Sequence, residues 1–453
     1  MSSFLGVNLR FKNQVLINLV TAPNALEPVA RVDLYNAITK TAVAITSIKS
    51  FSIRRSCAGF GDSFSVVIAE AAEWNERTTE HAGQLSGQKK YWLKFYSGYR
   101  INGLDFLYPY FVGIPSRVTE DYGPTAEAIT VTGYGLDYLL ALIDGSVTGQ
   151  TENISTIIQN LIDASDLDGS SVDLPTKSLI DEDINNDQAI QTIDYLMGAF
   201  PLCLIERYVD NLGNLVIREK QNLEAEFSYN AEIVMVLNRT INPQNLITVC
   251  AVTGSPLRQG VGKIYPVYAS DAIRLIIYNH GFATGDLITV GGVGSIGELD
   301  FSYINGSGLL VTKIDDSQIS LPIIMTQPDI VWIQFDDAWA MNSVDSVSAI
   351  VEDATGHLTD YGRKTRHVSN KFINSTADAA GLAQIKITDS INRMNQVRIK
   401  VPFNPYLRPG SIISVTENDR SKTSDKIYCE DLTATYQPDR ESAHTITGHI
   451  LPA

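Results

Sequence analysis

The chain is poor in the residues that most often carry chemistry. Its 453 residues include only 4 cysteines. These are scattered, at Cys57, Cys203, Cys250 and Cys429, and no Cys-x-x-Cys pair occurs. A zinc site needs ligands that are closely paired in sequence, so the cysteine pattern excludes the common zinc modules. We interpret the four as reduced and mostly buried thiols.

The histidines form no catalytic motif either. The sequence contains no HxH, HExxH or GxSxG. His444 and His449 are five positions apart, so in a continuous strand they would face opposite sides. We interpret them as ordinary strand or loop histidines. We therefore predict that the chain is not an enzyme, and we assign no catalytic, cofactor-binding or metal-binding residue.

Positive charge is scarce. The chain has 35 Lys and Arg residues against 51 Asp and Glu residues, a net charge of -16. Wrapping a polyanion requires clustered cations, which disfavours a protein that holds nucleic acid, but a pore through which DNA passes remains compatible. Two small basic clusters, at 362–367 and 420–426, are interpreted as solvated surface, with contact to an acidic partner or a phosphate as the alternative.

Long apolar runs and repeats are also missing. No uninterrupted run reaches the ~20 residues that span a bilayer, so we expect no membrane insertion. The opening residues have no long apolar core, so we do not expect a secretory signal there. Hydrophobic residues make up 44% of the chain, which is typical of a globular protein. The length predicts roughly three domains.

One acidic segment has the spacing of a calcium loop. Residues 181–192, DEDINNDQAIQT, place Asp181, Asp183 and Asn185 at ligand positions. Asn stands where the loop needs Gly, and Thr stands where it needs Glu. We therefore interpret the segment as a solvated loop in which Asp187 caps the following helix.

The pattern of apolar residues divides the chain into sections. Residues 1–135 alternate or run apolar over strand lengths, with a dense aromatic stretch at 91–111 that suits hairpins. Residues 136–235 change to helical spacing and end in a hairpin that turns at Asp210 to Asn214. Helices are expected at 136–144, 152–165 and 187–200.

The remainder is β again. Residues 236–269 and 341–453 are rich in short apolar runs, with one long helix expected at 375–396 and capped by Ser375. Residues 270–340 contain many short strands separated by turn residues. We expect this segment to be inserted into the surrounding β domain.

A glycine pattern inside this segment invites a different interpretation. A strand-like run at 287–290 leads into Gly292-x-Gly294-x-x-Gly297, as in dinucleotide-binding proteins. Such a site needs a helix directly after the third glycine, where the pyrophosphate binds. The next strand begins at about Leu309, which leaves no room for that helix and its connections. We predict a turn between short antiparallel strands and no cofactor.

Residues 279–322 contain Gly-Asp and Asn-Gly pairs, which are turn formers, and the strands between them are short. The residues that match a known module are His280, Gly281, Thr284, Gly285, Asp286, Gly292, Asn305, Gly306, Val311 and Leu321. With them, the stretch resembles the small β-barrel module that is inserted in many phage tail proteins. The module is often named for a domain of ubiquitin-activating enzymes.

Two further patterns lie outside this segment. In the N-terminal section, a strand ending in Phe-x-Gly precedes a strand, a glycine and a helix with Leu and Asp. Near the C-terminus, the long helix is followed by Pro-x-Leu-x-Pro-Gly and a strand. The residues of these patterns are Phe111, Gly113, Gly133, Leu139, Asp144, Pro405, Leu407, Pro409 and Gly410. In this order they resemble the two barrels of phage tail hubs, the late-control-D-like baseplate family.

The resemblance implies a multidomain, mainly β fold with a small α+β part. We expect a first tube-like β-barrel at 1–135 and an α+β domain of three helices and a hairpin at 136–235. A second tube-like barrel is expected at 236–269 and 341–453, with the small inserted barrel at 270–340. The implied function is that of a structural baseplate hub, assembled in the host cytoplasm and located in the virion tail.

The family also implies partners. A homotrimeric ring would adapt a hexameric tail tube to a trimeric spike and let DNA pass, in contact with the tube, the spike and other baseplate proteins. We expect acidic side chains along the channel, with both basic clusters pointing away from it. The alternative function is a peripheral receptor- or carbohydrate-binding tail protein that uses the inserted barrel and the aromatic stretch 91–111.

Overall fold

The computed structural model shows a chain that is mainly β, as the sequence predicts, with a few helices. It describes residues 27–451 apart from several short segments. These are 37–38, 58–60, 83–90, 102, 123–126, 166, 168–169, 221–222, 231–233, 255–258, 268–271, 279, 297–298, 325–331, 336–337, 344–346, 374, 417–424 and 439–441.

A sheet of 13 strands runs through one half of the molecule, in the order β14-β28-β31-β30-β3-β4-β7-β6-β5-β1-β2, with β29 beside β30 and β13 beside β29. The N-terminal strands are β1 (Glu27–Asn36), β2 (Ala42–Ile45), β3 (Ile48–Ser56), β4 (Ser63–Ile68), β5 (Tyr91–Ile101), β6 (Leu104–Tyr122) and β7 (Glu127–Gly135). The later strands are β13 (Phe227–Asn230), β14 (Val236–Ile241), β28 (Asn395–Pro402), β29 (Ile412–Thr416), β30 (Asp425–Tyr436) and β31 (Ala443–Ile450).

The N-terminal part of this sheet encloses an aromatic core. The rings of Phe64, Phe95 and Phe111 pack against one another with centroids 5.0–6.1 Å apart. The Phe64 ring lies directly over Gly113 and Gly133, where an added Cβ would approach it to 2.6 Å. These two positions therefore require glycine because a side chain would displace the ring.

A helix in this section was not predicted. We expected only strands before residue 136, but α2 (Ala71–Ala82) follows β4. Its side chains Ala71 and Trp74 are three positions apart and both are buried, which is the spacing of one helix face. The intervening polar residues make this pattern weak in the sequence.

The middle of the chain forms an α+β unit. The predicted helices are present as the 3₁₀ helix η2 (Leu136–Leu142), α3 (Ile154–Asp163) and α4 (Ala189–Met197). Asn153 caps α3 by accepting the Ser155 N–H. The hairpin β11 (Ile205–Val209) and β12 (Leu215–Glu219) turns at Asp210, whose carboxylate accepts the N–H of Asn214. The remaining strands are β8 (Val147–Asn153), β9 (Ser171–Asp173) and β10 (Ser178–Ile184).

A separate layer links the large sheet to the inserted segment. It consists of β15 (Val249–Gly254), β26 (Val347–Glu352) and β27 (Thr365–Ser369), in the order β26-β15-β27. The short helix α5 (His357–Tyr361) precedes β27. The predicted long helix is α6 (Thr376–Met394), and it packs on this sheet through Leu382 and Ile387. Ser375 caps it by accepting the N–H of Asp378, as expected.

The inserted segment consists of two four-stranded sheets around one core. The first sheet contains β16 (Gln259–Gly260), β25 (Trp339–Asn342), β19 (Leu287–Gly291) and β22 (Gly306–Leu310). The second contains β17 (Lys263–Val267), β18 (Ala272–Ile276), β24 (Gln318–Leu321) and β23 (Thr312–Asp315). A small hairpin, β20 (Ser295–Ile296) and β21 (Leu299–Asp300), extends from it.

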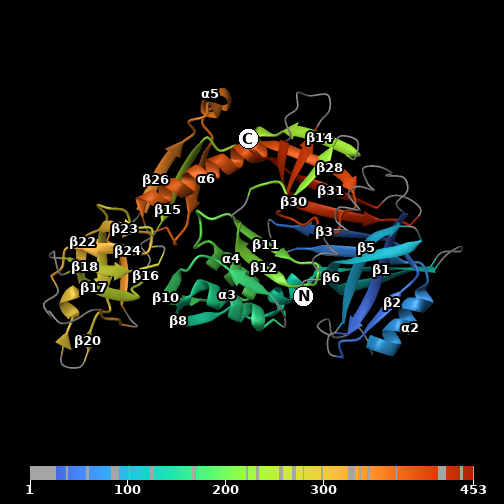
Figure 1. The fold of residues 1–453 in the computed structure, drawn as a ribbon, viewed down its shortest axis with the longest axis horizontal. Coiled ribbons are helices and arrows are strands. Elements are labelled where there is room, and N and C mark those ends of the chain that lie inside the picture. The colour runs from blue at the N-terminus through green and yellow to red at the C-terminus, as the bar shows by residue number, and fades with distance from the viewer. Residues whose placement is uncertain are drawn as a thin grey trace.

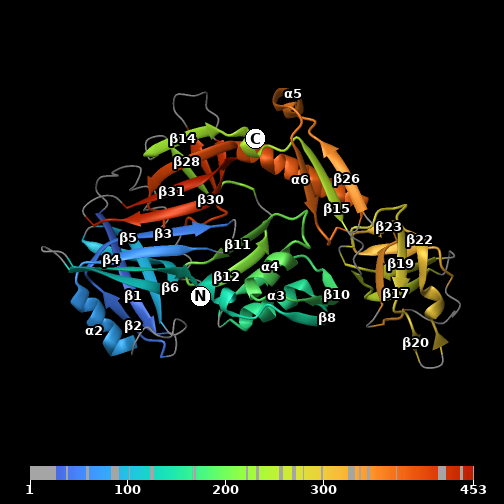
Figure 2. The same cartoon turned by 180° about the vertical axis from the view of Figure 1, so that it is seen from behind.

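These parts are arranged as an elongated arch (Figures 1 and 2). The N-terminal strands lie at one end and the inserted segment at the other. The α+β unit lies between them, and α6 with its sheet spans the top. Among the described residues, no helix is both long enough and apolar enough to cross a membrane.

Strand pairing differs from the sequence-based boundaries at several points. β13 lies within the expected α+β section, yet it pairs in parallel with β29 of the large sheet. β16 and β17 precede residue 270, yet they pair with strands of the inserted segment. β15 pairs with β26 and β27 outside the large sheet. Apolar periodicity identifies a strand but does not identify its partner, and the partner decides the boundary.

Candidate functional site

The strand β30 joins the N-terminal and C-terminal β sections. Residues 425–428 pair with β29, whereas residues 431–436 pair with β3. The exchange of partners occurs at a bulge between Cys429 and Asp431, where the ladder to β31 shifts register. One strand therefore couples two sections that lie at opposite ends of the sequence.

Arg55 lies at this junction, and its side chain is only 1% exposed. Its guanidinium group donates to the C=O of Val209 and, at 3.2 Å, to Oδ1 of Asn211. It also lies 5.5 Å from the centre of the Tyr110 ring, a cation–π contact. Because Val209 and Asn211 belong to the β11–β12 hairpin, Arg55 connects the large sheet to the α+β unit.

Two buried carboxyl groups lie at the junction, and one of them, Asp62, faces Arg55. Oδ2 of Asp62 is 3.8 Å from the Arg55 Nε. Oδ2 of Asp137 accepts the N–H of Gly61 at 3.2 Å. Burial and the nearby Asp62 raise the pKa of Asp137 to about 7. Burial also raises the pKa of Asp62, although Arg55 opposes the rise. The pair therefore retains a proton at pH values far above the usual pKa range of a carboxyl group.

Aromatic side chains also pack at the junction. His444 stacks on Tyr110 with centroids 5.5 Å apart and contacts Phe403 at 4.6 Å. Burial, together with the charge of Arg55, lowers the pKa of His444 to about 3, so the imidazole is neutral. Neither ring nitrogen of His444 has a hydrogen-bond partner in the described part of the chain. The surroundings therefore disfavour a second positive charge beside Arg55.

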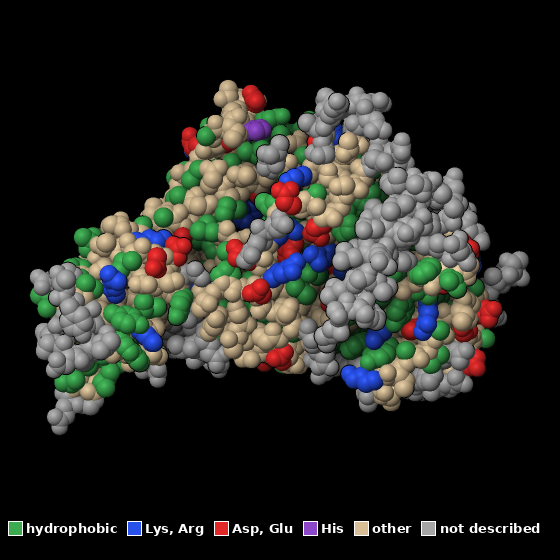
Figure 3. Space-filling model, in the orientation of Figure 1, with side chains coloured by type: hydrophobic (Ala, Val, Ile, Leu, Met, Phe, Trp, Pro, Cys, Tyr) green, Lys and Arg blue, Asp and Glu red, His purple; other side chains and the backbone are tan. Residues whose placement is uncertain are grey.

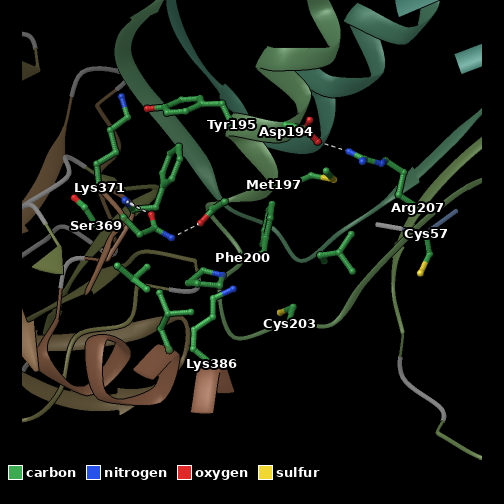
Figure 4. Close-up of a pocket in the computed structure, with 17 residues that line it drawn as sticks. Cys57, Asp194, Tyr195, Met197, Phe200, Cys203, Arg207, Ser369, Lys371 and Lys386 are labelled. Carbon is green, nitrogen blue, oxygen red and sulfur yellow. Dashed lines mark hydrogen bonds and ion pairs between the residues drawn. The ribbon is translucent and has the colours of Figure 1, made fainter. Parts of the chain in front are cut away.

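A cleft of about 780 Å³ opens next to the junction, between α4, the end of β27 and α6 (Figure 4). Cys57 lies on its wall, two residues beyond Arg55. Arg207 of β11 also lines it and pairs with Asp194 of α4. Since Arg207 acts to lower the pKa of both buried carboxyl groups, the cleft and the junction are connected electrostatically.

The rest of the cleft is mostly aromatic and apolar. Tyr195 and Phe372 pack with centroids 4.9 Å apart, and the ammonium group of Lys371 lies 4.3 Å from the centre of the Tyr195 ring. At one end, Nδ2 of Asn370 donates to the C=O of Gly198 at 2.9 Å, which ties the end of β27 to the end of α4. Such a surface suits an apolar or amphipathic partner.

A second charged network binds the hairpin to the C-terminal section. Glu206, only 2% exposed, accepts from Nζ of Lys220 at 2.5 Å and from Nε of Arg218 at 3.0 Å. Lys220 also donates to the C=O of Gly410, a residue of the Pro-x-Leu-x-Pro-Gly motif, at 2.6 Å. Around this network, on the face shown in Figure 3, charged side chains of both signs lie on the central part of the surface. The motif therefore contacts the α+β unit.

The cleft thiols are poorly suited to nucleophilic chemistry. Burial raises the pKa of Cys57, and burial with nearby Glu219 raises that of Cys203 to about 11, so both remain protonated at neutral pH. All four cysteines are free. No group of three or more His, Cys, Asp or Glu in the described residues is placed to hold a metal ion.

The glycine pattern forms turns, as predicted. Gly292 has a φ of +73° and follows β19, and the small hairpin β20–β21 comes next. β22 then returns antiparallel to β19. A single 3₁₀ turn lies between β21 and β22, in place of the helix that a dinucleotide site requires. Gly297 lies outside the described residues.

Three other sequence interpretations need correction. Asp181 and Asp183 lie in strand β10 rather than in a solvated loop or a calcium loop. The N-cap of α4 is Gln188, without a side-chain hydrogen bond, and is not Asp187. The aromatic stretch 91–111 supplies the core side chains Phe95, Tyr99, Tyr110 and Phe111, so those rings are buried and cannot form an exposed binding surface.

The histidines and basic clusters are placed as follows. His444 and His449 both lie in β31 and are buried, which agrees with strand histidines. Nδ1 of His449 is 3.3 Å from a carboxylate oxygen of Glu430. Of the first basic cluster, residues 362–364 precede β27, and Thr365, Arg366 and His367 are the exposed first three residues of that strand. Residues 420–424 of the second cluster lie outside the described residues.

Sequence motifs did not indicate the three charged residues of the junction, Arg55, Asp62 and Asp137. Arg55 falls two positions after Ile53 on the buried face of β3, so strand alternation alone predicts that it is buried. Asp137 follows Leu136 on the buried face of η2. The family resemblance indicated Asp144 instead, which is exposed and accepts the N–H of Ser146. No local pattern marks Asp62.

No protein-family model and no curated protein matches the chain. Solved structures do resemble it. The 43 kDa tail protein of prophage MuSo2 from Shewanella oneidensis is 12% identical, with 92% of this chain and 98% of that chain covered and a TM-score of 0.51. The tail protein from Neisseria meningitidis MC58 is 9% identical, with 93% and 96% covered and a TM-score of 0.54. The chain thus shares the fold of phage tail proteins over most of its length.

Proposed function

We propose that the chain is a structural protein of a phage tail and serves as the hub of its baseplate. The likeness to two tail proteins, which covers more than nine-tenths of each chain, supports a tail role. The observation that carries the hub role is the exchange of partners by β30. Through it, two β sections from opposite ends of the sequence become neighbours in one sheet.

The open margins of the large sheet support assembly into a ring. Its outermost strands in the described chain are β14 and β2. β14 is strongly exposed, including Val236 and Ile241, and is a template for further pairing. We assume that neighbouring copies pair through their sheet edges as the two β sections pair within one chain. Three copies with two sections each then close a ring with pseudo-sixfold symmetry. That ring would fit a hexameric tube on one side and a trimeric spike on the other.

The work of such a ring is mechanical and electrostatic. It would seal the tube, hold the spike and other baseplate proteins, and open for DNA, without covalent chemistry or a cofactor. The net charge of -16 suits a lumen that repels the DNA backbone, because a cationic lining would release counterions and hold the DNA. Assembly would occur in the host cytoplasm, and the finished ring would belong to the virion baseplate.

Cryo-electron microscopy of intact tails tests this function. We expect three copies on the tail axis, between tube and spike, with Asp and Glu concentrated on the inner strands. Native mass spectrometry of the protein with its spike should give three copies. A stable monomer in that complex, or a lumen lined by Lys and Arg, would contradict the hub.

The alternative is a peripheral protein that binds a receptor or a carbohydrate. One observation favours it: Trp332 and Tyr278 of the inserted segment are about half exposed, and Nζ of Lys263 lies 4.4 Å from the centre of the Trp332 ring. Exposed aromatic rings stack on sugars and on partner surfaces. Saturable glycan binding that is lost in Trp332→Ala, together with density at the tail periphery, would support this alternative over the hub.

A further inference from the structure

The strand β27 has an open edge. It is the last strand of its three-stranded sheet, and in the described chain it pairs only with β15. Four of its five residues are exposed, which is unusual for a strand in a parallel pair. Open edges are the places where an extended segment of another chain can add as a further strand.

The backbone of β27 is oriented for such an addition. The C=O of Lys364 and the N–H of Asn370 both bond to β15. Along a strand, the backbone N–H and C=O groups of alternate residues point to the same side. The N–H and C=O groups of Thr365, His367 and Ser369 therefore point away from the sheet and can pair with an added strand.

The same edge leads into the cleft beside the junction. Val368 and Ser369 line the cleft, with Phe200 of the α+β unit and Leu382 of α6 on other walls. Ser369 and Lys371 lie on one side of the cleft and Lys386 on another (Figure 4). An added strand would thus have an apolar wall to pack against as well as backbone partners.

The charges around this edge are mainly positive. Arg366 lies opposite Cys250 in the register of β27 and β15, and Lys386 of α6 lines the cleft. Both cations act against the rise that burial causes in the pKa of Cys250. Neither cation forms an ion pair within the described residues. Asp194, the carboxylate on the cleft wall, is already paired with Arg207.

We propose that the edge of β27 and the adjoining cleft bind an extended acidic segment of a partner protein by strand addition. Backbone groups of the segment pair with residues 365, 367 and 369. Its carboxylates meet Arg366 and Lys386, and an apolar residue two positions further on enters the cleft near Val368. The inference does not depend on the hub role, because any partner with such a segment would fit.

A synthetic peptide tests the proposal directly. The probe is fluorescein-labelled Thr-Glu-Thr-Glu-Thr-Val-Thr-Val, which alternates side chains as a strand does, and the control peptide carries Lys in place of Glu. Fluorescence anisotropy with the full chain should show saturable binding of the Glu peptide that weakens with salt, and none of the Lys peptide. Equal binding of both peptides, or no saturation up to about 1 mM, would overturn the proposal.

Variants then locate the binding. Lys386→Glu and Arg366→Glu should each weaken binding of the Glu peptide by about tenfold or more. Lys49→Glu is the matched control, because Lys49 is an exposed lysine of β3 that does not line the cleft. An equal effect of Lys49→Glu and Lys386→Glu would show only a general response to net charge and would refute the site.

The backbone contribution is tested on the peptide, so that folding of the protein is not at risk. N-methylation at alternate residues removes the donors on one side of the strand. One parity of methylation should abolish binding and the other should preserve it, and the amides of residues 365, 367 and 369 should exchange more slowly in the complex. Equal loss with both parities, or unchanged exchange, would exclude strand addition.

Discussion

The guanidinium group of Arg55 contacts three segments of the chain from inside the protein. It bonds to the β11–β12 hairpin, stacks on Tyr110 of β6 and faces the carboxylate of Asp62. A buried charge is stable only when such partners replace its hydration. Its position therefore couples the packing of the α+β unit to that of the large sheet.

Replacing Arg55 should destabilise the chain strongly. We expect Arg55→Met to lower the free energy of unfolding by about 3 kcal/mol, because it leaves Asp62 and the Val209 carbonyl without their partner. Chemical denaturation monitored by tryptophan fluorescence measures the change. The matched control is the adjacent Arg54→Met. The Arg54 side chain is 64% exposed, and its ion pair with Asp431 is long, at 3.7 Å, and solvent-screened, so we expect a loss below about 1 kcal/mol. Similar losses in both variants would contradict the role of Arg55.

Asp137 should make stability depend on pH in an unusual direction. Its pKa rises from the ordinary 3.8 to about 7 in the folded protein, so the folded state binds more protons than the unfolded state between these values. Its contribution to stability is therefore complete below about pH 4 and declines as the pH rises toward 7.

The variant Asp137→Asn removes this dependence. Its free energy of unfolding relative to the wild type should increase from pH 4 to pH 8, by an amount of the order of a few kcal/mol. Asp144→Asn is the control, because Asp144 is exposed at the other end of the same helical segment. Denaturation curves at several pH values provide the comparison. A difference that stays constant with pH would show that Asp137 is ionised in the folded protein.

The helix α2 is attached to the sheet by one acidic side chain. Glu73, in its first turn, accepts hydrogen bonds from the N–H and hydroxyl groups of Thr46 and Ser47, at 2.5–2.9 Å. Burial acts to raise the pKa of Glu73, but these hydrogen bonds outweigh it and lower the pKa to about 2. The helix is thereby fixed to the turn between β2 and β3.

Substitution of Glu73 should loosen this element. In Glu73→Gln an amide group faces two donors, so we expect a loss of roughly 1–3 kcal/mol at neutral pH. Because the folded pKa is lowered, the stabilisation is present above pH 4.5 and is lost as the pH falls toward 2. Glu76→Gln, on an exposed position of the same helix, is the control. A loss that is equal in both variants would mean that helix propensity alone decides.

The inserted segment enters and leaves the chain through neighbouring strands. Gly254 at the end of β15 lies opposite Val347 at the start of β26 in an antiparallel pair. The segment also has its own core, which includes Ile264, Ile288 and Ile319 from both of its sheets. A unit with a separate core and adjacent ends can be removed without opening the rest.

Deletion of residues 255–346 should therefore leave a folded protein. With a short Gly-Ser turn in their place, β15 and β26 become a hairpin, and we expect the remaining chain to stay soluble with cooperative thermal unfolding. Circular dichroism and size-exclusion chromatography measure this outcome. Any assembly into a trimer should persist as well. An aggregated or unfolded product would show that the segment is part of the main core.

Local signals made much of the secondary structure predictable. The cap residues Asn153 and Ser375, the turn at Asp210 and the glycines of the inserted segment act within a few residues of their own position. Because these effects depend on short stretches of sequence, local patterns predicted α3, α6 and the hairpin. They did not predict α2, because its short apolar face is interrupted by polar residues.

The sequence alone determined the class of the chain: a mainly β protein with a helical middle part and a self-contained inserted segment. Only the tertiary structure decided the partners. Arg55 and Asn211 are 156 positions apart, and no periodicity links them. The shared strand β30, the proton held by Asp62 and Asp137, and the open edge of β27 all depend on such distant contacts. Strand pairing and burial arise from the packing of the complete chain, whereas propensity and capping act over a few residues.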